Sequence, residues 1–243
     1  MYSVYWGDVP QNFGDVLTAN ILKHYGYRYK HTNIPEQANF FSTGSIVRLA
    51  KNSVILGSGI IRDEENLDPN NVYEFVRGPL TRARVLACGG DCPEIYGDPA
   101  LLLPRFCPPS PKKHAIGFVP HYSHRNKYTK QLAESNGWHY INLVNDDPLV
   151  PAKEISSCEK ILSTSLHGII AAHAYGIPAA HVTASKLKKL HGDGSKFADY
   201  YASVGLIHKK YHWEEPEFTV GNLPDLDKIE TIFREYADVY IPA

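Results

Sequence analysis

Two short segments of the chain combine residue types that bind anions and move protons. Residues 76–82 read VRGPLTR, and residues 162–169 read LSTSLHGI. If each segment joins a strand to a helix, the free N–H groups of the helix point towards the side chain at the junction. Arg77 would add a guanidinium that grips a phosphate or carboxylate through two hydrogen bonds. His167 would add a hydrogen-bond donor or a general acid.

Each of these residues also has a plainer interpretation. Arg77 could be a surface arginine ahead of an ordinary helix, and His167 a hydrogen-bonded structural histidine. The position of Arg77 at the carboxyl end of a strand favours a functional role for this arginine. Ser165 is a good N-cap residue, which places His167 in the first helical turn with its ring near the cleft. His173 is flanked by alanines farther along the same helical pattern and fits a structural role better.

Two weaker elements precede these junctions. Residues 12–15 (NFGD) come before a helical pattern and offer backbone amides and polar side chains to a ligand, although Asn12 or Asp15 would serve equally as a helix cap. Residues 57–59 (GSG) follow an apolar run, as ligand-approaching loops do, but a lone G-x-G is a weak signal.

These segments must be positioned by a fold in which short β-rich runs alternate with amphipathic helices, a pattern typical of parallel α/β architecture. We expect strands at 53–56, 72–76, 115–119, 139–144, 160–163 and 179–182. We expect helices at 15–24, 79–87, 128–136, 151–159, 166–175, 196–204 and 227–239.

A proline-rich stretch breaks this alternation near the middle of the chain, as a semi-rigid linker would. We therefore predict two Rossmann-like lobes, residues 1–107 and 114–243, joined by a linker at 108–113, with the last helix free to pack back onto the first lobe. Ligands of such folds bind outside the carboxyl ends of the strands, so we expect the active site in the cleft between the lobes.

The composition excludes several classes of function. Of 243 residues, 43% are hydrophobic and 21% are charged, as in globular proteins. The net charge of −1 gives no global field for nucleic acid or an anionic membrane, so a bound anion needs a local cluster. Residues 1–15 lack a signal-peptide pattern, and no stretch is long enough to span a bilayer. We expect a cytoplasmic protein that binds no nucleic acid, with peripheral contact at the inner membrane face left open.

The cysteines indicate neither disulfides nor a metal. Cys88, Cys92, Cys107 and Cys158 form no C-x-x-C pair, and the first two flank a turn-like Gly-Gly-Asp. We expect reduced thiols and no metal site.

Taken in order, these segments resemble the polysaccharide pyruvyl transferase family, from about residue 5 to about residue 205. The matching stretches are NFGDVL at 12–17, LGSGI at 56–60, VRGPLTRARVL at 76–86, GDPALLLP at 97–104, IGFVPHYSH at 116–124 and STSLHGIIAAHAYGIP at 163–178. The chain is short for this family, so we expect a reduced acceptor-binding surface.

The resemblance implies a fold like that of the two-domain GT-B glycosyltransferases. It implies phosphoenolpyruvate as donor substrate, no cofactor, and a hexose acceptor in a polysaccharide or in its lipid- or nucleotide-linked precursor. The product would be a cyclic pyruvate ketal. In the family, the arginine of the V-R motif and a Leu-His pair contact phosphoenolpyruvate, and the matching residues here are Arg77, Leu166 and His167.

The chemistry of phosphoenolpyruvate determines the roles that we expect of the site residues. Protonation of C3 makes C2 electrophilic, a sugar hydroxyl adds, phosphate leaves, and a second hydroxyl closes the ketal. We expect His167 to bind phosphate and protonate C3, and Arg77 to hold the donor, with Arg82 and Arg84 as further candidates. Candidates for the base are Asp15, Asp98 and His121. The remaining candidates for substrate binding are Asn12, Gly14, Gly57, Ser58 and Ser165.

Two other functions fit the same pattern. One is a GT-B glycosyltransferase that uses a nucleotide sugar; the other is a non-catalytic carbohydrate-binding protein, for which 16 tyrosines and three tryptophans would supply stacking surfaces. Residues 186–191 (KLKKLH) are interpreted as a solvated face, with an anionic glycan or a lipid diphosphate as the alternative ligand. The apolar and aromatic side of residues 196–201 is expected to pack on the core. The oligomeric state stays open.

Overall fold

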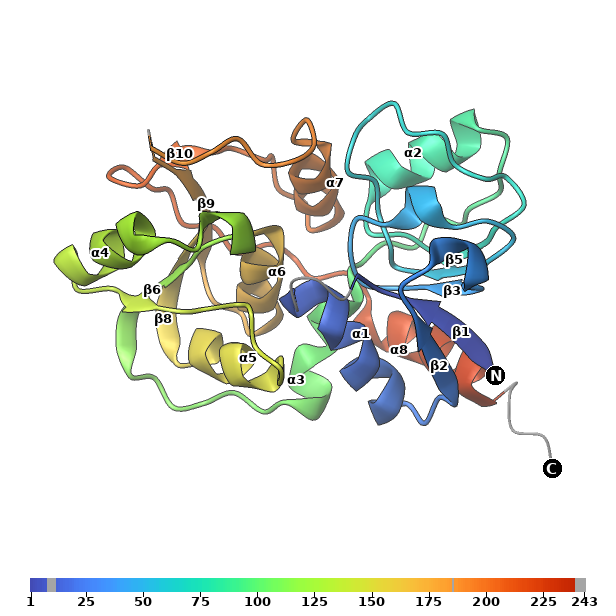
Figure 1. Ribbon diagram of the computed structural model, residues 1–243, viewed down its shortest axis with the longest axis horizontal. Coiled ribbons are helices and arrows are strands. Elements are labelled where there is room, and N and C mark those ends of the chain that lie inside the picture. Colours follow the sequence, from blue (N-terminus) through green and yellow to red (C-terminus); the bar gives the residue numbers. More distant parts are fainter. Residues whose placement is uncertain (8–11, 185, 239–243) are drawn as a thin grey trace.

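Two parallel five-stranded sheets form the framework of the protein (Figure 1). The computed structural model describes residues 1–7, 12–184 and 186–238. The first sheet has the order β2-β1-β3-β4-β5 and the second β10-β9-β8-β6-β7. All strand pairs within them are parallel, which confirms the predicted α/β class.

The first sheet belongs to the N-terminal half of the chain and the second to the C-terminal half. The first comprises β1 (Tyr2–Tyr5), β2 (Tyr29–Thr32), β3 (Phe40–Phe41), β4 (Val54–Leu56) and β5 (Val72–Phe75). The second comprises β6 (His114–Val119), β7 (His139–Tyr140), β8 (Cys158–Ser163), β9 (Ala179–Thr183) and β10 (Tyr211–His212).

Eight α-helices accompany the sheets within the described residues, and the starts of two show why they form there. In α2 a proline occupies the first turn, where its missing N–H costs nothing, and α4 begins with a capping box between Asn126 and Thr129. The helices are α1 (Phe13–His24), α2 (Pro79–Ala87), α3 (Leu103–Phe106), α4 (Lys127–Ser135), α5 (Leu149–Ser156), α6 (Leu166–Ala174), α7 (Ser195–Ser203) and α8 (Leu226–Asp238). Val239, the last residue of the helix expected at 227–239, lies outside the described residues.

The hydrophobic core runs through both halves. Every residue of α6 is buried, and this helix packs on the 3₁₀ turn Pro99–Leu102 of the N-terminal half. Phe13 and Leu17 of α1 belong to the same cluster of buried side chains as Ile169 of α6. The two halves therefore bury apolar surface against each other, and the residues at their boundary are held in place.

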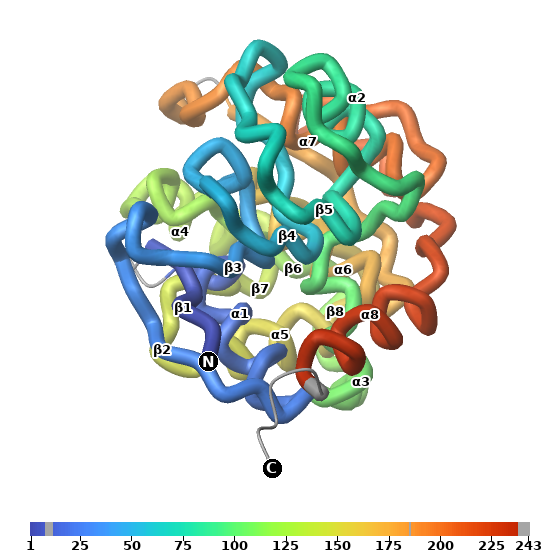
Figure 2. Tube along the Cα trace, turned by 90° about the vertical axis from the view of Figure 1, so that its right-hand side faces the viewer, coloured from blue at the N-terminus to red at the C-terminus, as the bar shows by residue number. Residues whose placement is uncertain are grey.

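Two helices from the end of the chain lie against the N-terminal half. Helix α8 lies beside α1 and β2 (Figure 1). The carbonyl of Phe233 in α8 accepts a 2.7 Å hydrogen bond from the Tyr27 hydroxyl, and the Phe233 ring stacks on Tyr25. Helix α7 packs against α2, and Figure 2 shows the two helices side by side above the first sheet. Residues 79–87 and 195–203 thus form a second contact between the halves.

Residues 108–113 contain no helix or strand and run from α3 to β6. The backbone N–H of Ser110 donates to the Ser156 hydroxyl at 2.9 Å, and Lys112 Nζ donates to the Ser156 carbonyl at 3.0 Å. The stretch is therefore anchored to α5 in the C-terminal half.

Within the described residues, no helix is both long and apolar enough to cross a bilayer. The four cysteines are free thiols. Among the same residues, no group of three or more His, Cys, Asp or Glu side chains is placed to hold a metal ion.

Candidate functional site

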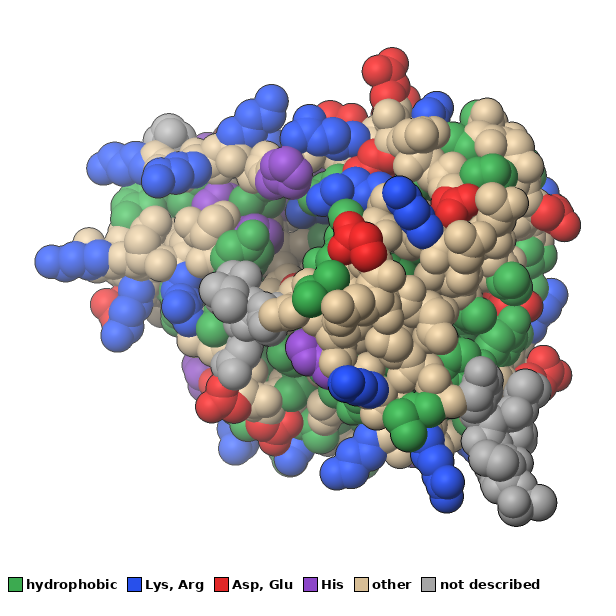
Figure 3. Space-filling view, turned by 45° about the vertical axis from the view of Figure 1, so that its right-hand side comes forward, with side chains coloured by type: hydrophobic (Ala, Val, Ile, Leu, Met, Phe, Trp, Pro, Cys, Tyr) green, Lys and Arg blue, Asp and Glu red, His purple; other side chains and the backbone are tan. Residues whose placement is uncertain are grey.

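A cavity of about 290 Å³ lies between the two halves, and we call it the small cavity. Figure 3 shows a hollow between the halves, with Lys, Arg and His side chains gathered along its upper edge. The N-terminal half lines the small cavity with Tyr5, Gly7, Asn12, Asp15, Gly44, Ser45, Ile46, Arg48, Leu49 and Ile61. The C-terminal half lines it with His121, Tyr122, Ser165, Leu166, His167, His191 and Lys196.

His167 stands in the first turn of α6, as the sequence predicts, with Ser165 at the N-cap position. The Ser165 side chain makes no capping hydrogen bond. The Ser163 hydroxyl accepts a 3.0 Å hydrogen bond from the backbone N–H of Ser165, and this bond holds the turn between β8 and α6. A Cβ on Gly14 would come within 2.1 Å of the His167 ring, so only glycine lets α1 approach the imidazole this closely.

Asp98 lies behind His167 rather than in the open cavity. It is fully buried, and its Oδ1 accepts a 3.0 Å hydrogen bond from the Ala100 backbone N–H. Its Oδ2 lies 3.6 Å from Nε2 of His167, and neither atom has a hydrogen-bond partner among the described residues. A carboxylate this close to Nε2 can orient the imidazole ring. Asp98 is thus placed to act through His167, whereas the sequence suggested a base that meets the sugar.

Asp15 faces the small cavity from the first turn of α1. Burial raises the pKa of its carboxyl from 3.8 to about 6, while the nearby His167 and a hydrogen bond from Asn12 oppose the shift. That bond, from Asn12 Nδ2 to Asp15 Oδ2, measures 3.3 Å. A carboxyl with a pKa near 6 exchanges protons readily at neutral pH.

His121 lines the small cavity as a neutral imidazole. Burial, with the charges of Lys196, His124 and His167, lowers its pKa to about 3. Its Nδ1 accepts a hydrogen bond from the Ser123 backbone N–H at 3.3 Å, and a backbone N–H can only donate. The proton of the neutral ring therefore sits on Nε2, so this nitrogen donates hydrogen bonds and is no base.

Lys196 is a cavity residue that the sequence analysis missed. It lies in the first turn of α7 and lines the small cavity, and no role was predicted for it. The apolar and aromatic side of residues 196–201 was expected to pack on the core. Phe197, Tyr200 and Tyr201 do pack there. Burial and the charge of Arg77 lower the pKa of Lys196 from 10.5 to about 8, so it remains mostly cationic at neutral pH.

Arg77 differs most from the expectation. Its side chain is fully buried and does not line the small cavity. Its Nε donates to Oδ2 of Asp199 at 3.0 Å and its Nη1 to the Ser45 hydroxyl at 2.6 Å. Its Nη2 lies 2.9 Å from Asp199 Oδ2 and donates to the carbonyl of Ile60 at 2.6 Å.

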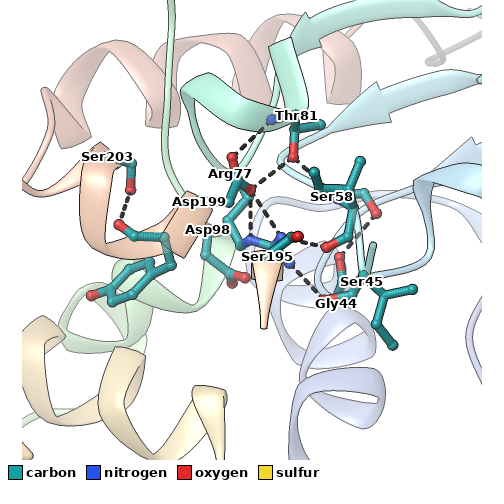
Figure 4. A network of polar contacts seen from close by, with 12 residues as sticks. Gly44, Ser45, Ser58, Arg77, Thr81, Asp98, Ser195, Asp199 and Ser203 are labelled. Carbon is teal, nitrogen blue, oxygen red and sulfur yellow. Dashed lines mark hydrogen bonds and ion pairs between the residues drawn. The ribbon is translucent and has the colours of Figure 1, made fainter. Parts of the chain in front are cut away.

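The junction between β5 and α2 nevertheless binds an anion, and that anion belongs to the protein. Oδ1 of Asp199 accepts a 2.8 Å hydrogen bond from the Thr81 backbone N–H in the first turn of α2, and Oδ2 accepts one of 2.7 Å from the Thr81 hydroxyl (Figure 4). The carboxylate of α7 thus takes the place predicted for a substrate anion. Arg77 donates to the Ser45 hydroxyl, and Ser45 lines the small cavity.

Several other predicted substrate-binding residues also lie away from the small cavity. Gly57 is packed against Pro99 and Phe75, and the Ser58 hydroxyl donates to the Gly44 carbonyl at 3.0 Å. Arg82 and Arg84 donate instead to the backbone carbonyls of Cys92 and Glu65. These residues shape loops on which the site depends and do not line it.

The small cavity therefore combines cations, hydrogen-bond donors and groups that exchange protons. Lys196 and Arg48 supply positive charge, and the free N–H groups at the start of α6 point towards the same space. His167 stands close enough to Asp15 to oppose the rise in the pKa of that carboxyl. Such a site can hold a small anion while a proton is delivered to it and another is removed.

Comparisons with known proteins agree with the resemblance noted in the sequence. Residues 12–185 match the family described as polysaccharide pyruvyl transferase. The chain is 36% identical over 182 residues to the uncharacterized protein L143 of Acanthamoeba polyphaga mimivirus, covering 71% of this chain and 62% of the relative. It is 28% identical over 230 residues to the succinoglycan biosynthesis protein ExoV of Rhizobium meliloti (strain 1021), covering 86% and 66%. The chain thus spans less than two thirds of each relative's length. No solved structure matches it.

Proposed function

The chain belongs to the polysaccharide pyruvyl transferase family, and we propose that it moves the pyruvyl group of phosphoenolpyruvate onto two hydroxyls of a hexose, forming a cyclic ketal. The name of the similar succinoglycan biosynthesis protein supports a carbohydrate acceptor. The two parallel sheets with a cavity between them are compatible with a GT-B-like arrangement, which we include in the proposal.

One observation carries the proposal: His167, with Asp98 behind it, and Asp15 meet in a cavity of about 290 Å³ that is also lined by Lys196. A cavity of this size suits a small dianionic or trianionic metabolite. We assign the phosphate of the donor to the start of α6 and to Lys196. Arg77 and Asp199 are assigned a positioning role, because they fix α7 and Ser45 without reaching the cavity.

The proposed reaction begins with a proton passing from His167 to C3 of the donor. C2 then becomes an oxocarbenium-like centre, and a sugar hydroxyl adds to it while giving its proton to Asp15. The bond between C2 and the phosphate oxygen breaks, and a second hydroxyl closes the ketal. The two hydroxyls release two protons; one balances the proton taken up by C3, and the other leaves with inorganic phosphate.

The test combines phosphate release with product mass. The protein is incubated with phosphoenolpyruvate and a panel of galactosides, mannosides and glucosides. We expect release of inorganic phosphate that depends on the acceptor, and a product heavier by pyruvate minus water. His167→Ala should lower kcat/KM by roughly 100-fold or more, because it removes the proton donor. The matched control is His212→Gln, because His212 is exposed and does not line the small cavity.

Failure to release phosphate with every acceptor would overturn the proposal. A sugar gained from a nucleotide sugar, in place of the pyruvyl group, would assign the protein to glycosyl transfer. A thermal-shift screen separates these outcomes early, since a ligand that binds only the folded state raises Tm. Phosphoenolpyruvate should raise the Tm of the wild type and raise that of His167→Ala less.

A further inference from the structure

A second and larger cavity, of about 720 Å³, adjoins the small cavity, and we call it the large cavity. It lies at the carboxyl ends of β8 and β9, where Thr164, Val182 and Thr183 line it, and it continues along residues 187–198. Asp63 and Leu80 close it from the N-terminal half. Its volume is more than phosphoenolpyruvate requires, so a different and larger ligand fits it.

The charged side chains around the large cavity favour an anion. Its lining includes four lysines, Lys188, Lys189, Lys196 and Lys210, against two aspartates, Asp63 and Asp193. Asp193 is already engaged: its carboxylate accepts hydrogen bonds from the backbone N–H groups of Asp63 at 3.0 Å and Ser195 at 2.9 Å. Lys188, Lys189 and Lys210 are exposed and stay free to meet a ligand at the rim. Figure 3 shows Lys and Arg side chains gathered near this edge.

Two imidazoles of the large cavity are kept neutral, chiefly by burial. Burial, together with the charges of His208, Lys210 and Lys196, lowers the pKa of His181 to about 2. Burial and Lys210 also lower the pKa of His208. These rings are therefore neutral at physiological pH, and the lysines carry the cavity's positive charge.

An uncharged, ring-lined wall accompanies the lysines. The rings of His181 and Phe197 stack at 3.8 Å with an interplanar angle of 6°, and His208 stacks on Phe197 at 5.3 Å. Leu187 and Leu190 add apolar surface. The large cavity can thus take a ligand with an anionic end and an uncharged body.

The two cavities meet at His191 and Lys196, which line both. A ligand in the large cavity can therefore place one end beside the donor in the small cavity. We propose that the large cavity binds the acceptor as a phosphate-bearing sugar, with the hexose next to Lys196 and a phosphate or diphosphate held by Lys188, Lys189 and Lys210. This inference rests on the proposed pyruvyl transfer. It gives residues 187–191 a binding role where the sequence favoured a solvated face.

The phosphate could come from a nucleotide or from a lipid carrier, and the experiment separates these sources. Binding is measured by calorimetry, without phosphoenolpyruvate, for a neutral galactoside, galactose 1-phosphate, a nucleoside diphosphate galactose and a galactosyl diphosphate on a short polyprenyl chain. We expect the phosphate-bearing ligands to bind at least tenfold more tightly than the neutral galactoside. The tighter of the two diphosphate ligands identifies the carrier.

The matched variants are Lys188→Gln/Lys189→Gln/Lys210→Gln and the control Lys127→Gln/Lys130→Gln/Lys153→Gln, whose exposed lysines line neither cavity. The first triple variant should lose roughly tenfold or more in affinity for the phosphate-bearing sugars and keep its affinity for phosphoenolpyruvate. The control should match the wild type. Equal binding of the neutral galactoside, or unchanged affinity in the first triple variant, would overturn the inference. Because no turnover is needed, this result is independent of whether pyruvyl transfer itself is found.

Discussion

Nε2 of His167 and Oδ2 of Asp98 lie 3.6 Å apart across the boundary between the two halves of the chain. Asp98 follows β5 in the N-terminal half, and His167 stands on α6 in the C-terminal half. The pair is aligned only when the halves are packed as they are here. The proposed acid is therefore complete only in the assembled molecule.

Asp98→Asn tests this alignment. The asparagine Oδ1 can keep the hydrogen bond from Ala100, while its Nδ2 is a donor, so the carboxylate oxygen that faces Nε2 of His167 is lost. We expect kcat to fall by roughly 100-fold with only a small loss of Tm. An unchanged kcat would remove Asp98 from the mechanism. Asp98→Ala, which also loses the Ala100 bond, should lose more Tm.

Asp15→Asn should change stability with pH in a defined direction. Folding raises the pKa of Asp15 from 3.8 to about 6, so the folded state prefers the protonated carboxyl. A raised carboxyl pKa costs stability once the pH exceeds the unfolded value, and the cost is complete above about 6. The variant should therefore have a higher Tm than the wild type at pH 8 and no such advantage at pH 4, while its kcat falls. An equal Tm difference at both pH values would contradict the raised pKa.

The lowered pKa of Lys196 predicts that affinity for phosphoenolpyruvate falls at alkaline pH. Its pKa is about 8, so the side chain is charged below that pH and loses its charge as the pH rises through it. The KM for phosphoenolpyruvate should rise above pH 8 in the wild type. Lys196→Arg, which stays cationic, should flatten this rise, and Lys196→Met should raise KM by roughly tenfold at pH 7. Lys130→Met, on the exposed face of α4, is the control. A wild-type KM that stays constant to pH 9 would argue against Lys196 as a ligand of the donor.

Arg77 and Asp199 should behave as one unit in stability measurements. Removing either partner leaves a buried charge unpaired, at a cost of about 3–5 kcal/mol. Arg77→Met and Asp199→Leu should each be strongly destabilising in urea unfolding. The double variant should lose much less than the sum of the two, because no unpaired charge remains. Additive losses, or single losses below about 0.5 kcal/mol, would show that the pair does not hold α7 to α2.

Arg77 and Asp199 show which features of the site can be predicted from local sequence and which cannot. The residues from 76 to 82 indicated an anion at a helix N-terminus, and an anion is there. It is Asp199, which lies 122 residues from Arg77 in the chain, and no local pattern shows that α7 reaches this junction. His167 was predictable because its N-cap and helical position depend on neighbouring residues. Lys196 was missed because its role depends on packing between the halves.

The secondary-structure predictions are likewise correct where the signal is local and wrong where it depends on neighbouring elements. The helix expected at 79–87 has the observed bounds, since a proline sets its first turn. Strands β1, β2, β3 and β10 were not expected: β2 (YKHT) has no buried residue, and β3 and β10 have only two residues each. The strand expected at 139–144 extends only over His139–Tyr140. Strands of this kind are defined by their hydrogen-bonded neighbours more than by their own residues.

The account depends on donor binding beside His167, and histidine NMR tests this directly. Protein labelled with ¹⁵N-histidine is titrated with phosphoenolpyruvate, and the His167 signal is assigned from His167→Gln. We predict saturable shifts of the His167 resonances, with the His173 resonances unchanged because that ring is buried against Tyr200. Binding of phosphoenolpyruvate that leaves His167 unchanged and shifts His181 or His208 instead would contradict the account.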